Sequence, residues 1–437
     1  MTGFFLTHTM FAMRTPIWAC LLAIATPSAS LNAGDWPHLR GPRYDGAAPA
    51  TNFLKTWPSE GPPKLWSREV GPGFSSFAIV GSRLYTGGTR DKQQTVICLD
   101  TVTGAVIWER PFEPEMTDPD PNLHGPRATP TVSDHRVYMM GSHARVFCFD
   151  AATGETVWEY ELHGKPHWGY SGSVLIDGHL AIFTAGGKDG SLRAVDKTTG
   201  KLVWTCGDDP AGYATPYPFD FEGKRYICGF MAESILIAER DTGRLVLRLP
   251  WPSHSGVNVA GPIFHDGRLL ISSGYGYGAA LFKLRKDGDN LAAEELWKSL
   301  KLRNKFQTPI LIDGKIYTCD ETGLKCVDFA TGKVEWLKRR IVHGPMLAVG
   351  RYLFLLRESG ELQVAEASPV GFEPISTASI FEGNTRSLWQ TVTKQRQGER
   401  CWTVPVFVDG LLYARDHTTV VCLDLRIEGA AKAGGEE

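Results

Sequence analysis

Side chains suited to binding an anion or a flat ring stand in the short segments that precede several apolar runs of this chain. Arginine and lysine bind carboxylate and phosphate groups, and tryptophan offers a flat apolar face. The candidates for one shared pocket are His124, Arg127, His167, Trp168, His254, Asn258, Arg303, Lys305, His343 and Trp402. There Arg127, Arg303 and Lys305 would supply charge, and the two tryptophans would stack on an anionic or sugar-like ligand. The alternative, which we favour from the sequence, is that these groups fill a central channel and satisfy buried backbone groups.

Other kinds of chemistry lack the residues that they need. Two histidines, His163 and His167, stand four residues apart, as metal ligands on one helical face would. Gly164 and Pro166 lie between them and argue against that helix. No Gly-x-Ser-x-Gly sequence is present, so no nucleophile of that type is expected. We therefore predict no catalytic residue and no metal site, and we lean toward a protein that is not an enzyme.

The elements that must position the candidates come from a repeated unit in which an Asp, a Thr-Gly pair and a Trp recur at fixed spacing. Complete copies run from Cys98 to Trp108, Cys148 to Trp158, Ala194 to Trp204 and Cys326 to Trp336. A weaker copy keeps Thr242-Gly243 but has Leu247 in place of Trp, and another is reduced to Trp297. Successive copies lie roughly 40 to 50 residues apart, a period typical of propeller blades.

Between the copies the pattern is that of β-strands. Paired runs of alternating apolar residues are joined by Asp-Gly, a strong hairpin signal, at Asp177-Gly178, Asp266-Gly267, Asp313-Gly314 and Asp409-Gly410. Innermost strands open near Phe74, Ala128, Gly172, Ala214, Gly261, Thr308, Pro345 and Val404, which predicts eight blades. The last blade lacks a fourth strand, and residues 64–70 can supply it. We therefore predict an all-β, eight-bladed β-propeller whose last blade is closed by the N-terminal strand.

The repeated unit resembles the tryptophan-docking motif of the quinoprotein-type eight-bladed propellers. This PQQ-like repeat superfamily holds the pyrroloquinoline quinone (PQQ) dehydrogenases and the outer-membrane assembly factor BamB, and the likeness covers nearly everything after residue 64. In that family the Trp of one blade packs against backbone near the Gly of a neighbouring blade. The resemblance implies docking roles for Trp66, Trp108, Trp158, Trp204 and Trp336 and for Gly104, Gly154, Gly200 and Gly332. The motif holds blades together, so it specifies fold rather than function.

Two functions follow from the resemblance. The one we favour is a BamB-like, non-enzymatic scaffold that binds envelope proteins or an anionic or sugar-like ligand. The alternative is a PQQ-dependent alcohol or sugar dehydrogenase with an atypical site. Such dehydrogenases typically clamp the quinone beneath a disulfide of adjacent cysteines and beside a calcium ion, and no two cysteines are adjacent here. We therefore predict no cofactor and keep PQQ with calcium as the alternative.

Eight of the nine cysteines follow the N-terminal segment. Cys98, Cys148, Cys326 and Cys422 share one repeat position, so we expect them to be small buried core residues in separate blades. Cys319 and Cys326 flank one hairpin turn, and the spacing leaves a disulfide between them open as an alternative.

The first 33 residues resemble a secretory signal, with Arg14 before an apolar core and small residues after it. Met13 is an alternative start, and lipidation at Cys20 is not expected because the apolar core continues beyond it. We expect an exported, periplasmic or extracellular monomer with no membrane span. Its parts are an extended arm over residues 34–63, the propeller over 64–427 and a disordered tail over 428–437. A net charge of −2 with no basic run makes nucleic acid an unexpected partner.

Overall fold

The computed structural model describes residues 1–3, 34–117, 124–187, 190–339, 341, 343–381 and 400–427. The chain divides into two units, Met1–Ser30 and Leu31–Glu437, and the second contains all the strands described below. The predicted signal sequence, the alternative start at Met13, Cys20 and the C-terminal tail lie outside the described residues. Among the residues that are described, no helix is long and apolar enough to cross a membrane.

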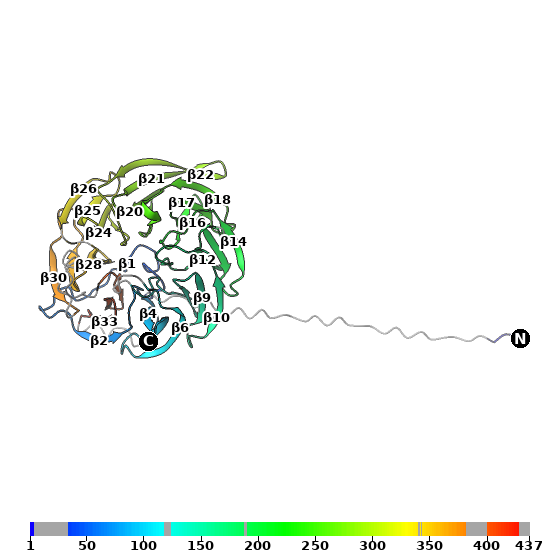
Figure 1. Ribbon diagram of the computed structural model, residues 1–437, viewed down its shortest axis with the longest axis horizontal. Coiled ribbons are helices and arrows are strands. Elements are labelled where there is room, and N and C mark those ends of the chain that lie inside the picture. Colours follow the sequence, from blue (N-terminus) through cyan, green and yellow to red (C-terminus); the bar gives the residue numbers. More distant parts are fainter. Residues whose placement is uncertain are drawn as a thin grey trace. The chain divides into compact units, whose positions relative to one another are not determined.

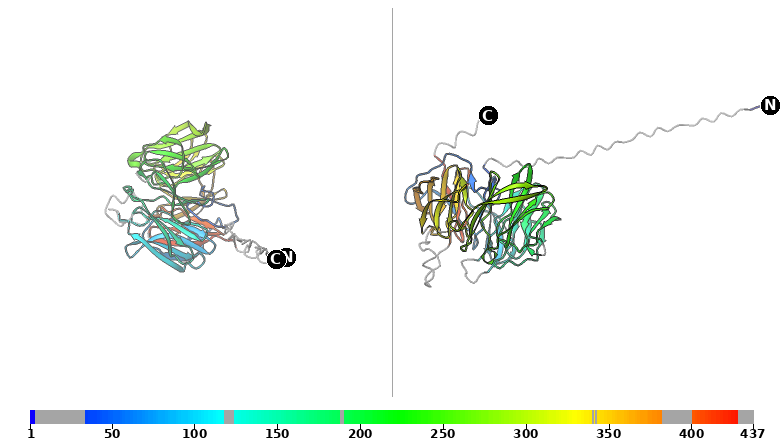
Figure 2. Two further views of the ribbon diagram at one scale, coloured as in Figure 1. Left: turned by 90° about the vertical axis from the view of Figure 1, so that its right-hand side faces the viewer. Right: turned by 90° about the horizontal axis from the view of Figure 1, so that it is seen from above.

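Eight sheets follow one another around a ring in Leu31–Glu437, each built on four antiparallel strands, and one of them has β1 (Ala47–Ala48) as a fifth, parallel strand (Figures 1 and 2). Blade 1 contains β3 (Ala78–Val80), β4 (Arg83–Arg90), β5 (Gln93–Asp100) and β6 (Val106–Pro114), and blade 2 contains β7 (Thr131–Ser133), β8 (Arg136–Met140), β9 (Arg145–Asp150) and β10 (Thr156–Glu161). Blade 3 contains β11 (Leu175–Asp177), β12 (Leu180–Thr184), β13 (Leu192–Asp196) and β14 (Leu202–Cys206), and blade 4 contains β15 (Tyr217–Phe221), β16 (Lys224–Phe230), β17 (Ser234–Glu239) and β18 (Leu245–Pro250). Blade 5 contains β19 (Ile263–His265), β20 (Arg268–Ser273), β21 (Gly278–Asp287) and β22 (Asn290–Ser299), and blade 6 contains β23 (Ile310–Ile312), β24 (Lys315–Asp320), β25 (Gly323–Asp328) and β26 (Val334–Arg339). Blade 7 contains β27 (Met346–Val349), β28 (Tyr352–Leu356), β29 (Glu361–Glu366) and β30 (Pro374–Ser379). The short helix η3 (His254–Gly256) lies between blades 4 and 5.

The eighth blade is assembled from both ends of the ring. It contains β31 (Val406–Val408), β32 (Leu411–Arg415) and β33 (Thr419–Asp424), and its outer strand is β2 (Lys64–Glu69). Strand β2 pairs antiparallel with β33, with Trp66 opposite Cys422. The prediction of an eight-bladed propeller closed by the N-terminal strand is therefore confirmed. Closure removes the unpaired edge that an open last blade would expose.

Tryptophans join neighbouring blades through one recurring contact. Each indole Nε1 donates to a backbone carbonyl of the next blade, at 2.9–3.1 Å, in the pairs Trp66–Thr101, Trp108–Ala151, Trp158–Lys197, Trp204–Arg240, Trp297–Phe329 and Trp336–Ser368. The first five rings also lie directly against a glycine: Gly104, Gly154, Gly200, Gly243 and Gly332, in that order. Trp297 thus keeps the docking role although the rest of its sequence unit is degraded. Trp336 keeps only the hydrogen bond, because no Thr-Gly turn stands near Ser368.

The aspartate of each unit shapes the turn that carries the glycine. Asp100 Oδ1 accepts hydrogen bonds from the backbone amides of Val102 and Thr103 and from the Thr103 hydroxyl. Asp150, Asp196 and Asp328 cap their turns through the same oxygen. These hydrogen bonds, led by the Thr103 amide, lower the pKa of Asp100. The aspartate carboxylates of the repeated unit therefore stabilise turns.

Three of the four Asp-Gly pairs form the expected hairpins with positive φ at both residues, as at Asp313 (47°) and Gly314 (71°). In blade 3 the turn is shifted by one residue along the chain. Asp177 pairs with Leu180 as part of the strand, so Gly178 and His179 form the turn.

The N-terminal arm lies inside the ring rather than merely on it. Trp36 exchanges two backbone hydrogen bonds of 2.7 Å with Ile79, the middle residue of β3. Strand β1 (Ala47–Ala48) pairs in parallel with the innermost strand of blade 7, and Figure 1 shows it in the middle of the ring. Farther along, Leu54 N donates to Leu425 O. The arm therefore crosses the channel and covers the ends of the innermost strands.

All eight described cysteines are buried, and Cys319 and Cys326 form no disulfide with each other. Five of them stand opposite a tyrosine on the neighbouring strand, as Cys98 does opposite Tyr85. The register also accounts for Cys319, which lies opposite Leu324 instead of Cys326. The thiols are thus part of the hydrophobic packing between blades.

Candidate functional site

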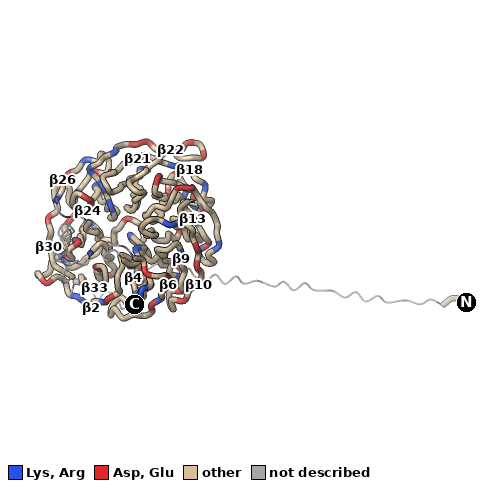
Figure 3. Tube along the Cα trace, viewed as in Figure 1, with Lys and Arg blue, Asp and Glu red and all other residues tan. Residues whose placement is uncertain are grey.

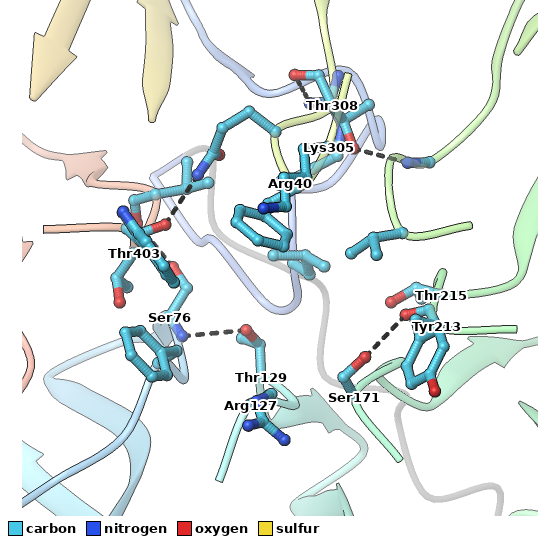
Figure 4. Close-up of a pocket in the computed structure, with 18 of the residues that line it drawn as sticks. Arg40, Ser76, Arg127, Thr129, Ser171, Tyr213, Thr215, Lys305, Thr308 and Thr403 are labelled. Atoms are coloured by element: carbon cyan, nitrogen blue, oxygen red, sulfur yellow. Dashed lines mark hydrogen bonds between the residues drawn. The ribbon is translucent and has the colours of Figure 1, made fainter. Parts of the chain in front are cut away.

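A cavity of about 530 Å³ occupies the centre of the ring. Its walls come mainly from the connections between blades, where the chain crosses to the next innermost strand; Tyr275, between β20 and β21, is an exception. The polar and aromatic side chains of the lining are Arg40, Tyr44, Phe74, Ser76, Arg127, Thr129, Trp168, Ser171, Tyr213, Thr215, Tyr217, Tyr275, Lys305, Phe306, Gln307, Thr308, His343, Arg400, Trp402 and Thr403. Figure 4 shows Lys305 and Thr308 on one side and Arg127 and Thr129 on the other.

The charge of the cavity is one-sided. Arg40, Arg127, Lys305 and Arg400 line it, and no Asp or Glu does so among the described residues. The chain as a whole is nearly balanced, with 46 basic and 48 acidic residues. Both signs are mixed around the outer strands in Figure 3. The described lining therefore concentrates positive charge where the rest of the protein does not.

Lys305 provides the most distinctive group of the cavity. Its ammonium lies 4.6 Å from the centroid of the Tyr275 ring and 5.0 Å from that of Phe306. Within the described residues its Nζ makes no hydrogen bond or ion pair. Burial lowers the pKa of Lys305, and the carboxylate of Glu321 offsets this only in part. A cation that is held by ring faces, and that forms no salt bridge among the described residues, is poised to receive an anion.

Trp402 belongs to an aromatic cluster beside Lys305. Its ring lies 5.6 Å from Phe74 and 5.1 Å from Phe306, and the Arg400 guanidinium lies 4.8 Å from its centroid. The indole Nε1 donates to Glu358 Oε1 at 2.9 Å. Because protein groups already pack on this ring, it serves as a wall more readily than as the open stacking face that the sequence suggested.

His343 lines the cavity next to this cluster, with its ring 5.7 Å from Phe306 and 6.0 Å from Trp402. Burial lowers the pKa of His343 to about 4, and the positive charge of Lys305 acts in the same direction. At neutral pH the imidazole is therefore uncharged.

The opposite wall carries Arg127, Trp168 and Tyr213. Arg127 Nη1 donates to the Trp168 carbonyl, and the Trp168 and Tyr213 rings are 6.0 Å apart. Burial raises the pKa of Tyr213. This wall offers a second cation beside flat apolar surface.

Five of the ten predicted pocket residues line the cavity: Arg127, Trp168, Lys305, His343 and Trp402. The other five are placed elsewhere, as follows. His124 has an ion-pair contact with Glu115 of 3.6 Å, His167 packs edge-on against Trp168, and His254 lies in η3. Asn258 is buried and donates to Met231 O, and the amide of Arg303 donates to Asp320. These five residues lie in the connections between blades but do not line the cavity. Whether the first five bind a ligand stays a prediction.

The sequence did not reveal that three threonines and the N-terminal arm line the cavity. Thr129, Thr215 and Thr308 each stand before a proline at the start of an innermost strand, so the recurring Thr-Pro pair could have revealed them. Arg40 belongs to the predicted extended arm, for which the sequence suggested no contact with a pocket. Its side chain is half-buried, and the guanidinium donates to Thr308 O and Pro309 O, at 3.2 and 2.9 Å. Burial lowers the pKa of Arg40 to about 10. Together with Tyr44, it brings the arm into the cavity wall.

The described lining does not fit a calcium-bound quinone. Calcium takes six to eight oxygen ligands, in large part carboxylates. No carboxylate lines the cavity in the part of the chain that is described, and no group of three or more His, Cys, Asp or Glu residues there could hold a metal. The cations could still contact an anionic organic molecule directly.

Sequence comparison assigns this ring of blades to a known group of proteins. The family described as outer membrane protein assembly factor BamB, a PQQ-like repeat family, matches residues 58–167 and 92–338. The chain belongs to this PQQ-like β-propeller family. The expected membership is thus confirmed, and the match covers the end of the arm and most of the propeller.

Relatives of the family include dehydrogenases. Quinoprotein alcohol dehydrogenase PedH of Pseudomonas putida is 35% identical over 97 residues, which are 21% of this chain and 16% of PedH. Lanthanide-dependent methanol dehydrogenase of Methylacidiphilum fumariolicum is 46% identical over 57 residues, 13% of this chain and 8% of that protein. The matched segments thus span less than a fifth of these enzymes.

Solved structures share the fold at low identity. BamB from Moraxella catarrhalis has a TM-score of 0.57 at 14% identity, covering 86% of this chain and 99% of that one. Quinohemoprotein alcohol dehydrogenase from Comamonas testosteroni has a TM-score of 0.62 at 15% identity, covering 89% and 80%. The same fold therefore occurs both in a protein named as a dehydrogenase and in BamB, which is not named as one.

Proposed function

We propose that this protein is a non-enzymatic binding scaffold of the cell envelope and that its central cavity receives an anionic ligand. The observation that carries the proposal is the lining: four cations and several aromatic rings, with no carboxylate among the described residues. Such a surface attracts an anion and offers apolar contact to the rest of it. Export to the envelope is part of the proposal and is supported by the resemblance of the N-terminal segment to a secretory signal.

The cavity also has the form of a binding site. It has one wall built from the arm, and pockets of 300–1,000 Å³ are typical for small ligands. The wall groups stand on connections fixed by rigid blades, which limits the ordering that binding requires. The lining carboxylate that could act as a general base is missing from the described residues, which favours binding over turnover.

Calorimetric titration with anionic and neutral compounds tests this proposal. Saturable binding of an anion that weakens as salt increases supports it, because salt screens charge–charge attraction. Binding that is equal for anionic and neutral compounds contradicts it.

The alternative function is a PQQ-dependent oxidoreductase, favoured by the similarity to PedH. Purified protein incubated with PQQ and calcium should show neither dye-linked alcohol nor aldose oxidation if the scaffold proposal is correct. Steady turnover that depends on both additions would overturn it.

A further inference from the structure

Several residues around the cavity hold backbone conformations that ordinary residues avoid. Tyr275 and His343 have φ values of 54° and 56°, in the left-handed region, and so do Arg40 and Tyr44 at 69° and 59°. All four line the cavity. Tyr275 lies in the turn between β20 and β21, which the Tyr277 amide closes by donating to Gly274 O, and Arg40 lies in the turn that the Gly41 amide closes by donating to His38 O. Positive φ is expected in such turns, and here the turns bring both side chains to the cavity.

The conformation of Tyr275 is fixed by a neighbouring blade. The backbone amides of Tyr275 and Gly276 donate to the two carboxylate oxygens of Glu321. This places the Tyr275 ring over the Lys305 ammonium, with Phe306 near the same group. The ammonium is therefore positioned before any ligand arrives.

A second set of donors surrounds the cavity at the starts of the innermost strands. The hydroxyl oxygens of Thr129, Thr215 and Thr308 accept hydrogen bonds of 2.8–3.1 Å from the amides of Ser76, Ser173 and Gly261. Figure 4 shows the contact between Ser76 and Thr129. None of the three hydroxyls donates to a protein acceptor among the described residues. Each is oriented by the preceding blade and has a proton left to give.

The lining thus offers threonine hydroxyls as hydrogen-bond donors at three separate places. It also offers positive charge, and two of its cations, Lys305 and Arg400, lie beside the same aromatic cluster. A matching ligand carries one carboxylate and several uncharged oxygen acceptors. A phosphate is less well matched, because phosphate sites commonly use free backbone amides. Here the amides of Ser76, Ser173 and Gly261 are already bonded between blades.

We propose that the ligand is a carboxylated carbohydrate, such as a hexuronate or the end of an acidic oligosaccharide. Its carboxylate lies between Lys305 and Arg400, and its hydroxyl oxygens accept from the threonine hydroxyls. The apolar face of its ring lies toward Trp168 and Tyr213. This assignment rests on the proposed function, since it names the chemical class of the anion.

The test compares four probes by calorimetry: D-glucuronate, D-glucose, cyclohexanecarboxylate and PQQ without calcium. Glucose keeps the ring oxygens without the carboxylate, and cyclohexanecarboxylate keeps the charge without the hydroxyls. We expect glucuronate to bind at least tenfold more tightly than either. Lys305→Gln should weaken glucuronate binding at least tenfold, whereas Lys301→Gln, at an exposed lysine outside the cavity, should leave it unchanged. An unchanged melting temperature for both variants separates lost binding from lost folding.

The outcomes distinguish the two proposals. If cyclohexanecarboxylate or PQQ binds as tightly as glucuronate and needs Lys305, the carbohydrate assignment fails and the anion-binding function stands. If glucose binds as tightly as glucuronate, the role of Lys305 fails and with it this assignment. If no probe binds, or if Lys305→Gln changes nothing, both proposals are overturned.

Discussion

Glu358 accepts the indole hydrogen of Trp402 at 2.9 Å, and this buried carboxylate fixes an aromatic wall of the cavity from behind. Trp402 in turn lies against Phe74 and Phe306, and Phe306 flanks Lys305. The position of the cavity's most distinctive cation therefore depends on a residue of blade 7 that does not line the cavity.

Replacing Glu358 should weaken ligand binding through Trp402. A hydrogen bond to a charged group contributes about 1.5–3 kcal/mol, so Glu358→Ala should lower the affinity for an anionic ligand by about tenfold or more. Glu358→Gln keeps an oxygen acceptor and should recover much of the affinity. Calorimetry on both variants measures the effect. Glu373→Ala, at an exposed carboxylate paired with Lys338, is the control, and an equal loss there would contradict the positioning role.

Gly104 should tolerate no side chain, because the Trp66 ring occupies the space. A Cβ atom there would lie 2.5 Å from the ring, and the residue has a φ of 65°. Gly288 is a matched control, with a φ of 60° and no heavy atom within 4 Å of the corresponding position. Both alanine variants carry the cost of positive φ, so the difference between them reports the clash. Overpacking costs about 1–3 kcal/mol, and urea denaturation should show Gly104→Ala as the less stable variant by that amount.

Replacing Arg40 by lysine should destabilise the folded protein. Its guanidinium donates to four backbone carbonyls, two in the arm and two at the start of β23. Lysine keeps the charge but cannot reach all four acceptors, so Arg40→Lys should lower the free energy of unfolding by about 1–3 kcal/mol. Arg43→Lys alters an exposed pair with Asp45 and should change it by less than about 1 kcal/mol. Faster proteolysis within residues 34–54 in the Arg40 variant would show that the arm has loosened. If both variants unfold alike, Arg40 does not anchor the arm.

Acidification should destabilise the folded protein through two histidines. Burial lowers the pKa of His343 and of His38 from 6.5 to about 4. Between these values the unfolded chain binds protons that the folded chain does not, so stability is highest above pH 6.5 and falls as pH drops toward 4. His343→Gln should reduce this slope, measured by urea denaturation at pH 4.5 and 7. His179→Gln, at an exposed position, should keep the wild-type slope. A slope unchanged by His343→Gln would contradict the lowered pKa.

Regular spacing made much of the ring predictable. The Asp…Thr-Gly…Trp unit reports local turn chemistry, since Asp100 bonds the turn that Gly104 completes. Trp297 was harder to interpret because its unit has lost the Asp and the Thr-Gly, yet its ring still reaches Gly332 in the next blade. That contact depends on the neighbouring blade and leaves no trace near Trp297 itself.

The candidate residues were predictable only as a group. Lys305 and Asn258 stand at similar places before an innermost strand, and sequence alone gave them the same role. In the structure Lys305 lines the cavity, whereas the Asn258 amide turns to the carbonyls of Met231 and Ala232. A shift of one or two residues in an irregular connection reverses the direction of a side chain, and no repeat pattern records that shift.

The sequence by itself determined the eight blades, their closure by β2 and the membership of the PQQ-like family, because each of these follows from contacts repeated at a fixed spacing. Only the tertiary structure decided that the arm crosses the channel, that Arg40 joins the wall and that the Lys305 ammonium lies near two aromatic rings. These arrangements join residues from different blades, and each is made once. A contact that occurs once between distant segments has no period, so it becomes visible only when the ring is closed.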